Sequence, residues 1–283
     1  MDVEGQYDLV GGGSGYWQAW LPDGDPRAVV VVVHGFGEHS GRYDHVGRRF
    51  ARNGFAAYAA DHRGHGRTPT GHRANIHRMA TVVDDLAGFV RFAAGRAPGA
   101  PLVILGHSMG ALIALQYATR DVPQRQNPTE LAALVLTGAA VQVSIASPLL
   151  KRAARVLSAV VPNLGVLALP PEDVSRDPAV VAAYRADPLV HHGKIPARTG
   201  AEILTATVAL PDRLPRLRVP VLLVHGTQDR LAPPAGSAMV HDRVGSADRT
   251  LRLLPGLAHE VMNEPEQDEV LDEIVQWIIE HVA

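Results

Sequence analysis

The chain of 283 residues contains no cysteine, very little lysine and few aromatic residues. Without cysteine it cannot form a disulfide, use a thiol nucleophile or hold a metal through thiolates. Its 27 basic and 29 acidic residues give a formal net charge of −2, so no excess of positive charge favours nucleic acid as a partner. No apolar run reaches the ~18 residues that a membrane span needs, and the first residues show no secretory signal. We therefore expect a cytoplasmic protein.

Short apolar runs alternate with segments of helical spacing along most of the chain. The run 28–33 reads AVVVVV, and a continuous β-branched run is typical of a strand buried on both faces of a parallel sheet. A glycine-rich turn within residues 1–20 predicts a preceding β-hairpin. Similar apolar runs occupy 54–60, 101–105, 131–136, 219–224 and 250–254, and helical spacing occurs within 82–92, 112–116 and 270–282. This alternation predicts a doubly wound α/β fold with a mostly parallel sheet. Asn263 with Glu266 three residues later predicts the N-terminal cap of the last helix.

The alternation of strands and helices stops between residues 139 and 210. This stretch is too long for a loop in a compact domain, and it is rich in leucine, valine and proline. We expect it to form an inserted helical lid over a core made of residues 1–138 and 211–283. Its part from Val156 to Leu169 is short of charge, which suits contact with a lipid surface. Burial against the core or in a homodimer would explain the same composition.

The sequence Gly106-His107-Ser108-Met109-Gly110 follows a predicted buried strand and precedes a predicted helix. This is the G-x-S-x-G pattern in the strand–turn–helix context that it requires. The glycines permit a sharp turn that exposes the serine hydroxyl, and the free N–H groups of a helix N-terminus favour a developing negative charge. Ser108 is therefore the candidate nucleophile.

A serine nucleophile needs a base, and the base needs an acid that orients it. In α/β-hydrolases the three residues follow the order serine, acid, histidine. Asp229 follows the predicted strand 219–224 and His259 follows the predicted strand 250–254, so both lie where such folds place catalytic groups. The rival acids lie before the first of these strands or on or after the next helix: Asp212, Asp242 and Asp248.

Two backbone amides are expected to form an oxyanion hole. One belongs to Met109, the residue after the nucleophile. The other belongs to Phe36, in the glycine-rich turn that follows the strand 28–33. His62 and His65 have the spacing of a metal pair, but no further ligand cluster accompanies them in the sequence. We expect neither a metal ion nor a cofactor.

The segments HGFGEHSGRY, DHRGHGRT, GHSMG, YRADPL, HGTQDR and PGLAHE together resemble monoacylglycerol lipases, especially the bacterial ones. The resemblance covers nearly the whole chain. It implies a triad of Ser108, Asp229 and His259, an oxyanion hole of Phe36 and Met109, and a lid that forms the acyl tunnel. It also implies that Glu38, Arg42 and Tyr184 surround the glycerol head group. From the residues alone, a surface ion pair is the alternative for Glu38 and Arg42, and a packing residue of the lid is the alternative for Tyr184.

These features predict a serine hydrolase that cleaves monoacylglycerols to glycerol and fatty acid through an acyl-serine intermediate. A lysophospholipase or a broad carboxylesterase would have the same triad, and a non-catalytic binding protein of this fold is a more distant alternative. The serine at position 108 argues against dehalogenases and epoxide hydrolases, which use an aspartate nucleophile. The expected partner is a lipid substrate, and the lid is the expected place of any peripheral contact with a membrane.

Overall fold

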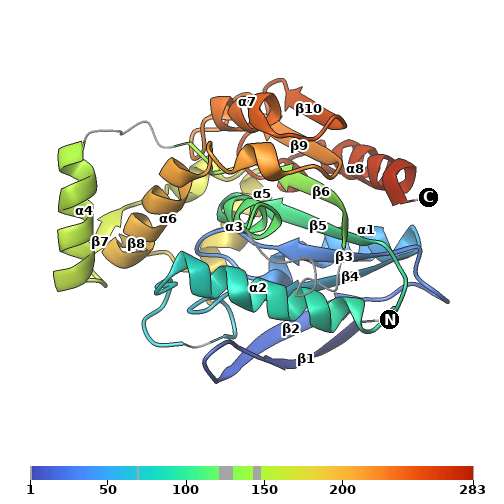
Figure 1. The fold of residues 1–283 in the computed structure, drawn as a ribbon, viewed down its shortest axis with the longest axis horizontal. Helices are drawn as coiled ribbons and strands as arrows, with labels where there is room; N and C mark the ends of the chain where they lie inside the picture. Colours follow the sequence, from blue (N-terminus) through green and yellow to red (C-terminus); the bar gives the residue numbers. More distant parts are fainter. Residues whose placement is uncertain (1, 69, 121–129, 143–147, 283) are drawn as a thin grey trace.

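The computed structural model describes residues 2–68, 70–120, 130–142 and 148–282. An eight-stranded sheet runs through its centre in the order β1-β2-β4-β3-β5-β6-β9-β10 (Figure 1). In chain order the strands are β1 (Asp2–Asp8), β2 (Ser14–Trp20), β3 (Ala28–Val33), β4 (Phe55–Ala60), β5 (Leu102–His107), β6 (Leu131–Thr137), β9 (Val221–Gly226) and β10 (Arg249–Leu254).

Six of these strands run parallel, from β4 across to β10, whereas the hairpin β1–β2 joins β4 in the antiparallel sense. The predicted mostly parallel sheet is thus confirmed. Strand β3 is buried along its whole length, as its valine run predicts. Strand β10 is the exception among the predicted buried runs: it is the edge strand, and Leu253 is 44% exposed.

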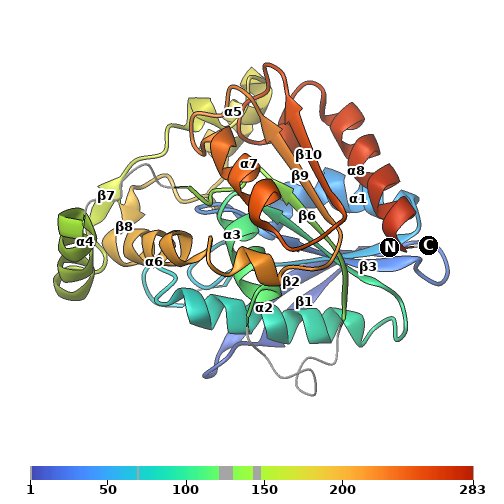
Figure 2. The same cartoon turned by 45° about the horizontal axis from the view of Figure 1, so that its top comes forward.

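Helices cover both faces of the sheet, which gives three layers (Figures 1 and 2). The side chains of α2 (Met79–Ala94), α3 (Met109–Ala118) and α7 (Pro234–Arg243) join one apolar cluster with one face. Those of α1 (Asp44–Arg52) and α8 (Gln267–Val282) join a second cluster with the other face. The predicted cap at Asn263 is wrong. Asn263 belongs to a 3-10 turn, Val261–Asn263, and α8 begins four residues later, at Gln267.

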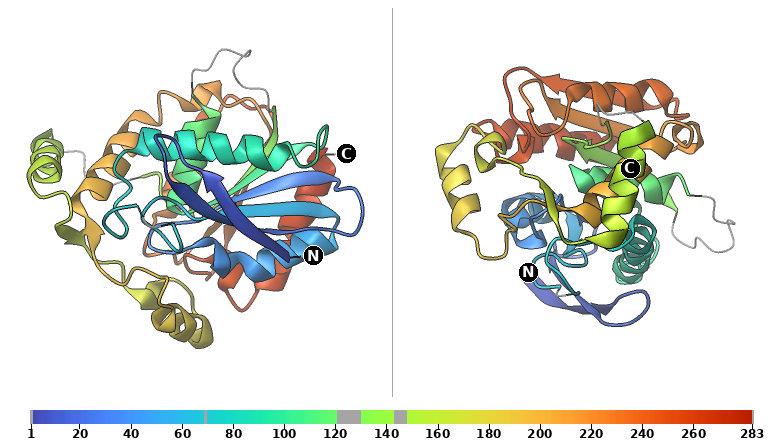
Figure 3. Two further views of the ribbon diagram at one scale, coloured as in Figure 1. Left: turned by 90° about the horizontal axis from the view of Figure 1, so that it is seen from below. Right: turned by 90° about the vertical axis from the view of Figure 1, so that its left-hand side faces the viewer.

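The described part of the segment between β6 and β9 adds no strand to the central sheet, because its two short strands, β7 and β8, pair with each other. Its elements are α4 (Pro148–Val160), β7 (Gly165–Leu167), α5 (Pro178–Ala186), β8 (Ile195–Pro196) and α6 (Ala197–Ala209). It lies beyond one end of the central sheet, with α4 farthest from it (Figures 1 and 3). The His191 amide donates to the Gly37 carbonyl, and the Ile76 amide donates to the Thr199 hydroxyl. The segment thus contacts the loops that follow β3 and β4. No helix in the described ranges has the length and apolarity of a membrane span.

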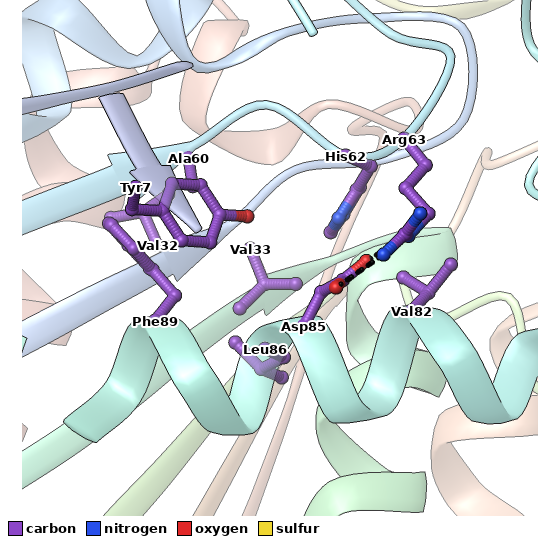
Figure 4. Close-up of a pocket in the computed structure, with 10 residues that line it drawn as sticks. All are labelled: Tyr7, Val32, Val33, Ala60, His62, Arg63, Val82, Asp85, Leu86 and Phe89. Atoms are coloured by element: carbon purple, nitrogen blue, oxygen red, sulfur yellow. Dashed lines mark hydrogen bonds and ion pairs between the residues drawn. The ribbon is translucent and has the colours of Figure 1, made fainter. Parts of the chain in front are cut away.

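The N-terminal hairpin is attached to α2 through a buried carboxylate, that of Asp85. It accepts hydrogen bonds from the Val10 amide at 2.8 Å and from Nη2 of Arg63 at 2.9 Å, and Arg63 also donates to it through Nε. Figure 4 shows Arg63 and Asp85 meeting at one end of a small cavity whose walls include Tyr7 and Phe89. Burial raises the pKa of the Tyr7 phenol, and the charge of Asp85 adds to this shift. Asp85 therefore stabilises the attachment of the hairpin to the core.

Replacing Asp85 by alanine should lower the free energy of unfolding by about 3–5 kcal/mol, because it leaves the buried Arg63 charge without its partner. Urea unfolding followed by circular dichroism measures this. Asp84→Ala is the matched control, since Asp84 is exposed on the same helix and its loss should cost no more than about 0.5 kcal/mol. Equal losses in the two variants would contradict a specific role for Asp85.

Candidate active site

The predicted nucleophile lies at the turn between β5 and α3. Ser108 has φ 53° and ψ −117°, a conformation that costs a non-glycine residue free energy and that is characteristic of a nucleophile elbow. Both glycines of the motif are needed for packing. A Cβ atom at Gly110 would lie 1.9 Å from the Val33 carbonyl oxygen, and one at Gly106 would lie 2.8 Å from the Cα atom of Ala111. The turn therefore requires this sequence.

Three predicted residues form one hydrogen-bonded chain at the ends of β5, β9 and β10. His259 Nε2 lies 2.9 Å from Ser108 Oγ, and His259 Nδ1 lies 2.7 Å from Asp229 Oδ2. An Nδ1–H donates to the carboxylate, which leaves Nε2 free to accept from the serine hydroxyl. The other oxygen of Asp229 accepts from the amides of Leu231 and Ala232, each at 2.8 Å. The carboxylate is thereby fixed toward the imidazole.

The charges of this chain stabilise one another. Burial raises the pKa of Asp229, but hydrogen bonds from His225 and His259 outweigh it and hold that pKa below its usual range. Burial lowers the pKa of His259, but the hydrogen bond and charge of Asp229 outweigh it, so the pKa of His259 is raised. These shifts favour an ionised aspartate beside a basic imidazole.

The rival acids lie elsewhere. The Asp242 side chain is 76% exposed and pairs with His241, and Asp248 pairs with His281. Asp212 precedes a 3-10 turn that begins at Leu214. His225, which sequence reasoning treats as a packing or hydrogen-bonding residue, has that role: it is fully buried and its Nε2 lies 2.9 Å from Asp229 Oδ2.

The loop after β3 faces the serine across the turn. A Cβ atom at Gly35 would lie 3.1 Å from the Ser108 Cβ, so glycine permits the close approach. The Gly35 amide donates to Glu38 Oε1 at 2.7 Å, and the Gly37 carbonyl accepts from the His191 amide at 2.7 Å. Phe36 therefore lies between two residues, Gly35 and Gly37, whose backbones are each held by a hydrogen bond. Within the described ranges neither the Phe36 nor the Met109 amide has a hydrogen-bond partner.

Glu38 and Arg42 form a buried ion pair, so the alternative of a surface pair is wrong. Arg42 Nη1 donates to Glu38 Oε2 at 2.8 Å, and the two side chains are only 10% and 5% exposed, arginine first. The guanidinium carbon lies 4.7 Å from the ring centroid of Tyr184, which brings the predicted lid residue to the same place. The Tyr43 hydroxyl donates to Glu38 at 2.8 Å.

Sequence reasoning misses one member of this cluster, Glu260. Its carboxylate binds the Arg42 guanidinium with two hydrogen bonds, at 2.6 and 2.7 Å. The only signal in the sequence is its position directly after His259. Since Arg42 and Glu260 are 218 residues apart, no local pattern announces their contact.

The histidines considered as a metal pair bind protein atoms instead. His62 donates its amide to His34 Nε2, and its own Nε2 contacts the His34 carbonyl at 3.0 Å. His65 Nδ1 contacts the Arg63 carbonyl at 2.9 Å. Burial lowers the pKa of His62 to about 4 and that of His65 to about 3, so both are neutral near pH 7. These rings contact residues at the end of β3 and in the loop that follows it: the ring centroids are 4.1 Å apart for His62 and His34, and 5.7 Å apart for His65 and Phe36.

Comparison with known proteins agrees with this geometry. The family described as serine aminopeptidase, S33, matches residues 24–266. The chain is 46% identical to a monoacylglycerol lipase of Mycolicibacterium smegmatis over 96% of this chain and 95% of the relative. It is 33% identical to human monoglyceride lipase over 100% of this chain and 90% of that one. The solved structure of Paleococcus ferrophilus monoacylglycerol lipase superimposes with a TM-score of 0.80 at 29% identity, covering 94% of this chain and 99% of that one. The chain therefore belongs to the α/β-hydrolase family that contains the monoacylglycerol lipases.

Proposed function

We propose that this protein hydrolyses the ester bond of monoacylglycerols and releases glycerol and a fatty acid. The observation that carries the proposal is the hydrogen-bonded chain from Asp229 through His259 to Ser108, beside a buried polar cluster. The relatives named monoacylglycerol lipase and monoglyceride lipase support the choice of substrate.

The reaction has two halves that use the same base. Ser108 Oγ attacks the ester carbonyl while His259 Nε2 takes its proton, and the ionised Asp229 stabilises the imidazolium. His259 then returns the proton to the glycerol oxygen as the C–O bond breaks, which leaves the acyl group on Ser108. Water attacks this acyl-enzyme while His259 Nε2 takes its proton. The bond between the acyl carbon and Ser108 Oγ then breaks, His259 returns the proton to Oγ, and the fatty acid leaves.

The negative charge on the carbonyl oxygen needs donors that are already in place. The amides of Phe36 and Met109 have this role in the proposal. Met109 is the first residue of α3, so its amide adds the favourable field of a helix N-terminus. Each such donor is worth about 3–4 kcal/mol to the transition state.

Glu38, Arg42 and Tyr184 are proposed to contact the glycerol head group. Arg42 uses three of its five guanidinium N–H groups on the two glutamates, and within the described ranges the Nε–H and one Nη2–H have no partner. The Arg42 side chain as a whole is 10% exposed. These two donors suit the free hydroxyls of a monoacylglycerol.

The lid, residues 139–210 in this proposal, carries the apolar surface for peripheral contact with lipid. Several large aliphatic side chains there are about half exposed or more: Val156, Val160, Leu164 and Leu167 at 57%, 72%, 51% and 57%. Several large exposed aliphatic side chains within one short segment suit a face that binds lipid.

The substrate proposal is tested by hydrolysis of mono-, di- and trioleoylglycerol by the same preparation. The monoacylglycerol should react at least about 100-fold faster, since a second acyl chain would replace hydroxyls and leave Arg42 and Glu38 desolvated. Tyr184→Phe should narrow this difference and spare a short aryl ester, because it removes one head-group hydroxyl and leaves the ion pairs of Arg42 intact. Comparable rates on mono- and triolein would refute the proposed substrate.

The proposed nucleophile has a separate test. Ser108→Ala should abolish both turnover and labelling by a serine-directed phosphonate. Labelling of Ser108→Ala would refute the nucleophile.

The orienting acid has its own test. Asp229→Asn should lower kcat about 10⁴-fold, because an amide favours the wrong tautomer of His259. Asp242→Asn should leave kcat within about twofold, since that carboxylate is exposed on α7. Steady-state kinetics with a soluble ester compares the two. A severe loss in Asp242→Asn with normal activity in Asp229→Asn would reverse the assignment.

The lipid-contact role predicts a difference between substrates. Replacing both Leu164 and Leu167 by serine should reduce turnover of dispersed long-chain monoacylglycerol about tenfold or more and leave short soluble esters unchanged. Each leucine is about half exposed, so its transfer into lipid contributes about 1 kcal/mol. Binding to vesicles of neutral lipid should weaken in parallel. Equal loss on both substrates would indicate a structural role for these leucines.

A further inference from the structure

The carboxylate of Glu260 is held in one position directly after the catalytic histidine. Oε1 accepts from Arg42 Nη1, and Oε2 accepts from Arg42 Nη2 and from Asn263 Nδ2 at 2.9 Å. The Glu260 amide donates to the Val174 carbonyl at 2.8 Å, so the backbone is fixed as well. Glu260 is only 5% exposed. A buried carboxylate with three donors, two of them on one arginine, has a firmly defined geometry.

One guanidinium serves two carboxylates at this place. Arg42 binds Glu260 with two hydrogen bonds and Glu38 with one. Burial raises the pKa of Glu260, but Arg42 outweighs it and the pKa is lowered. Burial, aided by the charge of Glu260, raises the pKa of Glu38. Of the two carboxylates, Glu260 is therefore the one that is held more firmly in its charged form. Arg42 shares its single positive charge between both of them.

His259 stands among groups from four parts of the fold. Asp229 after β9 and Ser108 at the end of β5 are its hydrogen-bond partners, and the centroid of the His107 ring lies 4.8 Å from that of its own ring. After β3, Glu38 binds the Gly35 amide beside Ser108, and Arg42 links Glu38 to Glu260, the residue that follows His259 in the chain. The charges of Glu260 and Glu38 act on the imidazole in the same direction as that of Asp229. His107 is neutral, because burial and His259 lower its pKa to about 3. The charges around His259 thus favour its protonated form, the imidazolium.

We propose that Glu260 is a positioning residue for the catalytic base, and that its carboxylate, held by Arg42 and Asn263, supplies a second fixed negative charge beside the imidazolium of His259. The inference rests on the roles proposed above for Ser108 and His259. The imidazolium exists only after proton transfer, so a fixed anion beside it stabilises the transition state more than the ground state. Glu260 touches neither the substrate nor the reacting atoms in this account. It acts through His259.

The test is the pH dependence of kcat/KM for the wild-type chain, Glu260→Gln and Glu260→Asp, each with a monoacylglycerol and a short soluble ester. The acidic limb reports His259, which must be neutral to act as base. Because Glu260 favours the imidazolium, Glu260→Gln should move this limb about 0.5–1 pH unit lower and reduce kcat on the plateau about three- to tenfold. Glu260→Asp keeps the charge and should keep the limb near its wild-type position.

The same shift is expected with both substrates, because the charge acts on the base whatever the leaving group. A change confined to KM for the monoacylglycerol would overturn the proposal in favour of a role in head-group binding alone. Glu266→Gln is the matched control: it removes a charge of the same kind six residues later, where the side chain is 39% exposed, and it should move nothing. An equal shift in this control would also overturn the proposal.

Thermal unfolding and phosphonate labelling establish that each variant is folded and has a reactive serine. If Glu260→Gln does not fold, Glu260→Met, which removes the charge but fills the space, makes the same prediction for the acidic limb. An unchanged limb in a folded neutral variant refutes the role of Glu260. Activity that survives in Ser108→Ala would instead refute the proposed nucleophile, so the two failures are distinguishable.

Discussion

The site depends on the close approach of three stretches of backbone around Ser108. The serine has a positive φ, and such a conformation persists only where its surroundings define it. Here Gly110 lets α3 meet the end of β3, and Gly35 lets the next loop meet the serine itself. Side chains at these positions would separate the nucleophile from the loop that carries the Phe36 amide. Glycine at two distant places in the sequence thus creates one reactive centre.

A second constraint is that several charged side chains are buried close to Ser108. Asp229, Glu38, Glu260 and Arg42 are removed from water together, which is tolerable only because every carboxylate has several donors. Arg42 pairs with two of them, and amides or hydroxyls complete the others. This leaves negative charge near His259, which suits the role proposed for it as a base that becomes a cation.

Much of the fold and the central triad were predictable, because the relevant signals are local. The run 28–33 identifies a buried strand by composition alone, and the glycines around Ser108 identify the turn. Asp229 and His259 follow strand ends, and a parallel sheet brings its strand ends to one edge. Composition could not reveal that β10 is an edge strand, since this depends on which strands pair. The cap at Asn263 failed because a 3-10 turn intervenes before α8.

Local sequence patterns do not predict contacts between segments that lie far apart in the chain. The side chain of Glu260 could have faced solvent, and only Arg42, which lies 218 residues earlier, makes it part of the site. Likewise, Glu38 and Arg42 have the spacing of an exposed pair on a helix, and their burial follows from the approach of Tyr184 and Glu260. The resemblance to monoacylglycerol lipases predicts that such residues belong to the site, whereas their contacts are seen only in the three-dimensional structure.

The inserted segment illustrates the same point on a larger scale. Near the site it is attached to the core at two places: Val174 and Arg176 bind the turn after His259, and Asp187 and His191 bind the loop after β3. Farther out, α4 packs chiefly on α6 and β7 pairs with β8, and the side-chain hydrogen bond between Asn163 and Asn75 is a link to the core. The large exposed aliphatic side chains gather on this outer part. The segment therefore combines an inner portion that is bound to the core and brings Tyr184 to Arg42 with an outer portion that carries exposed apolar side chains.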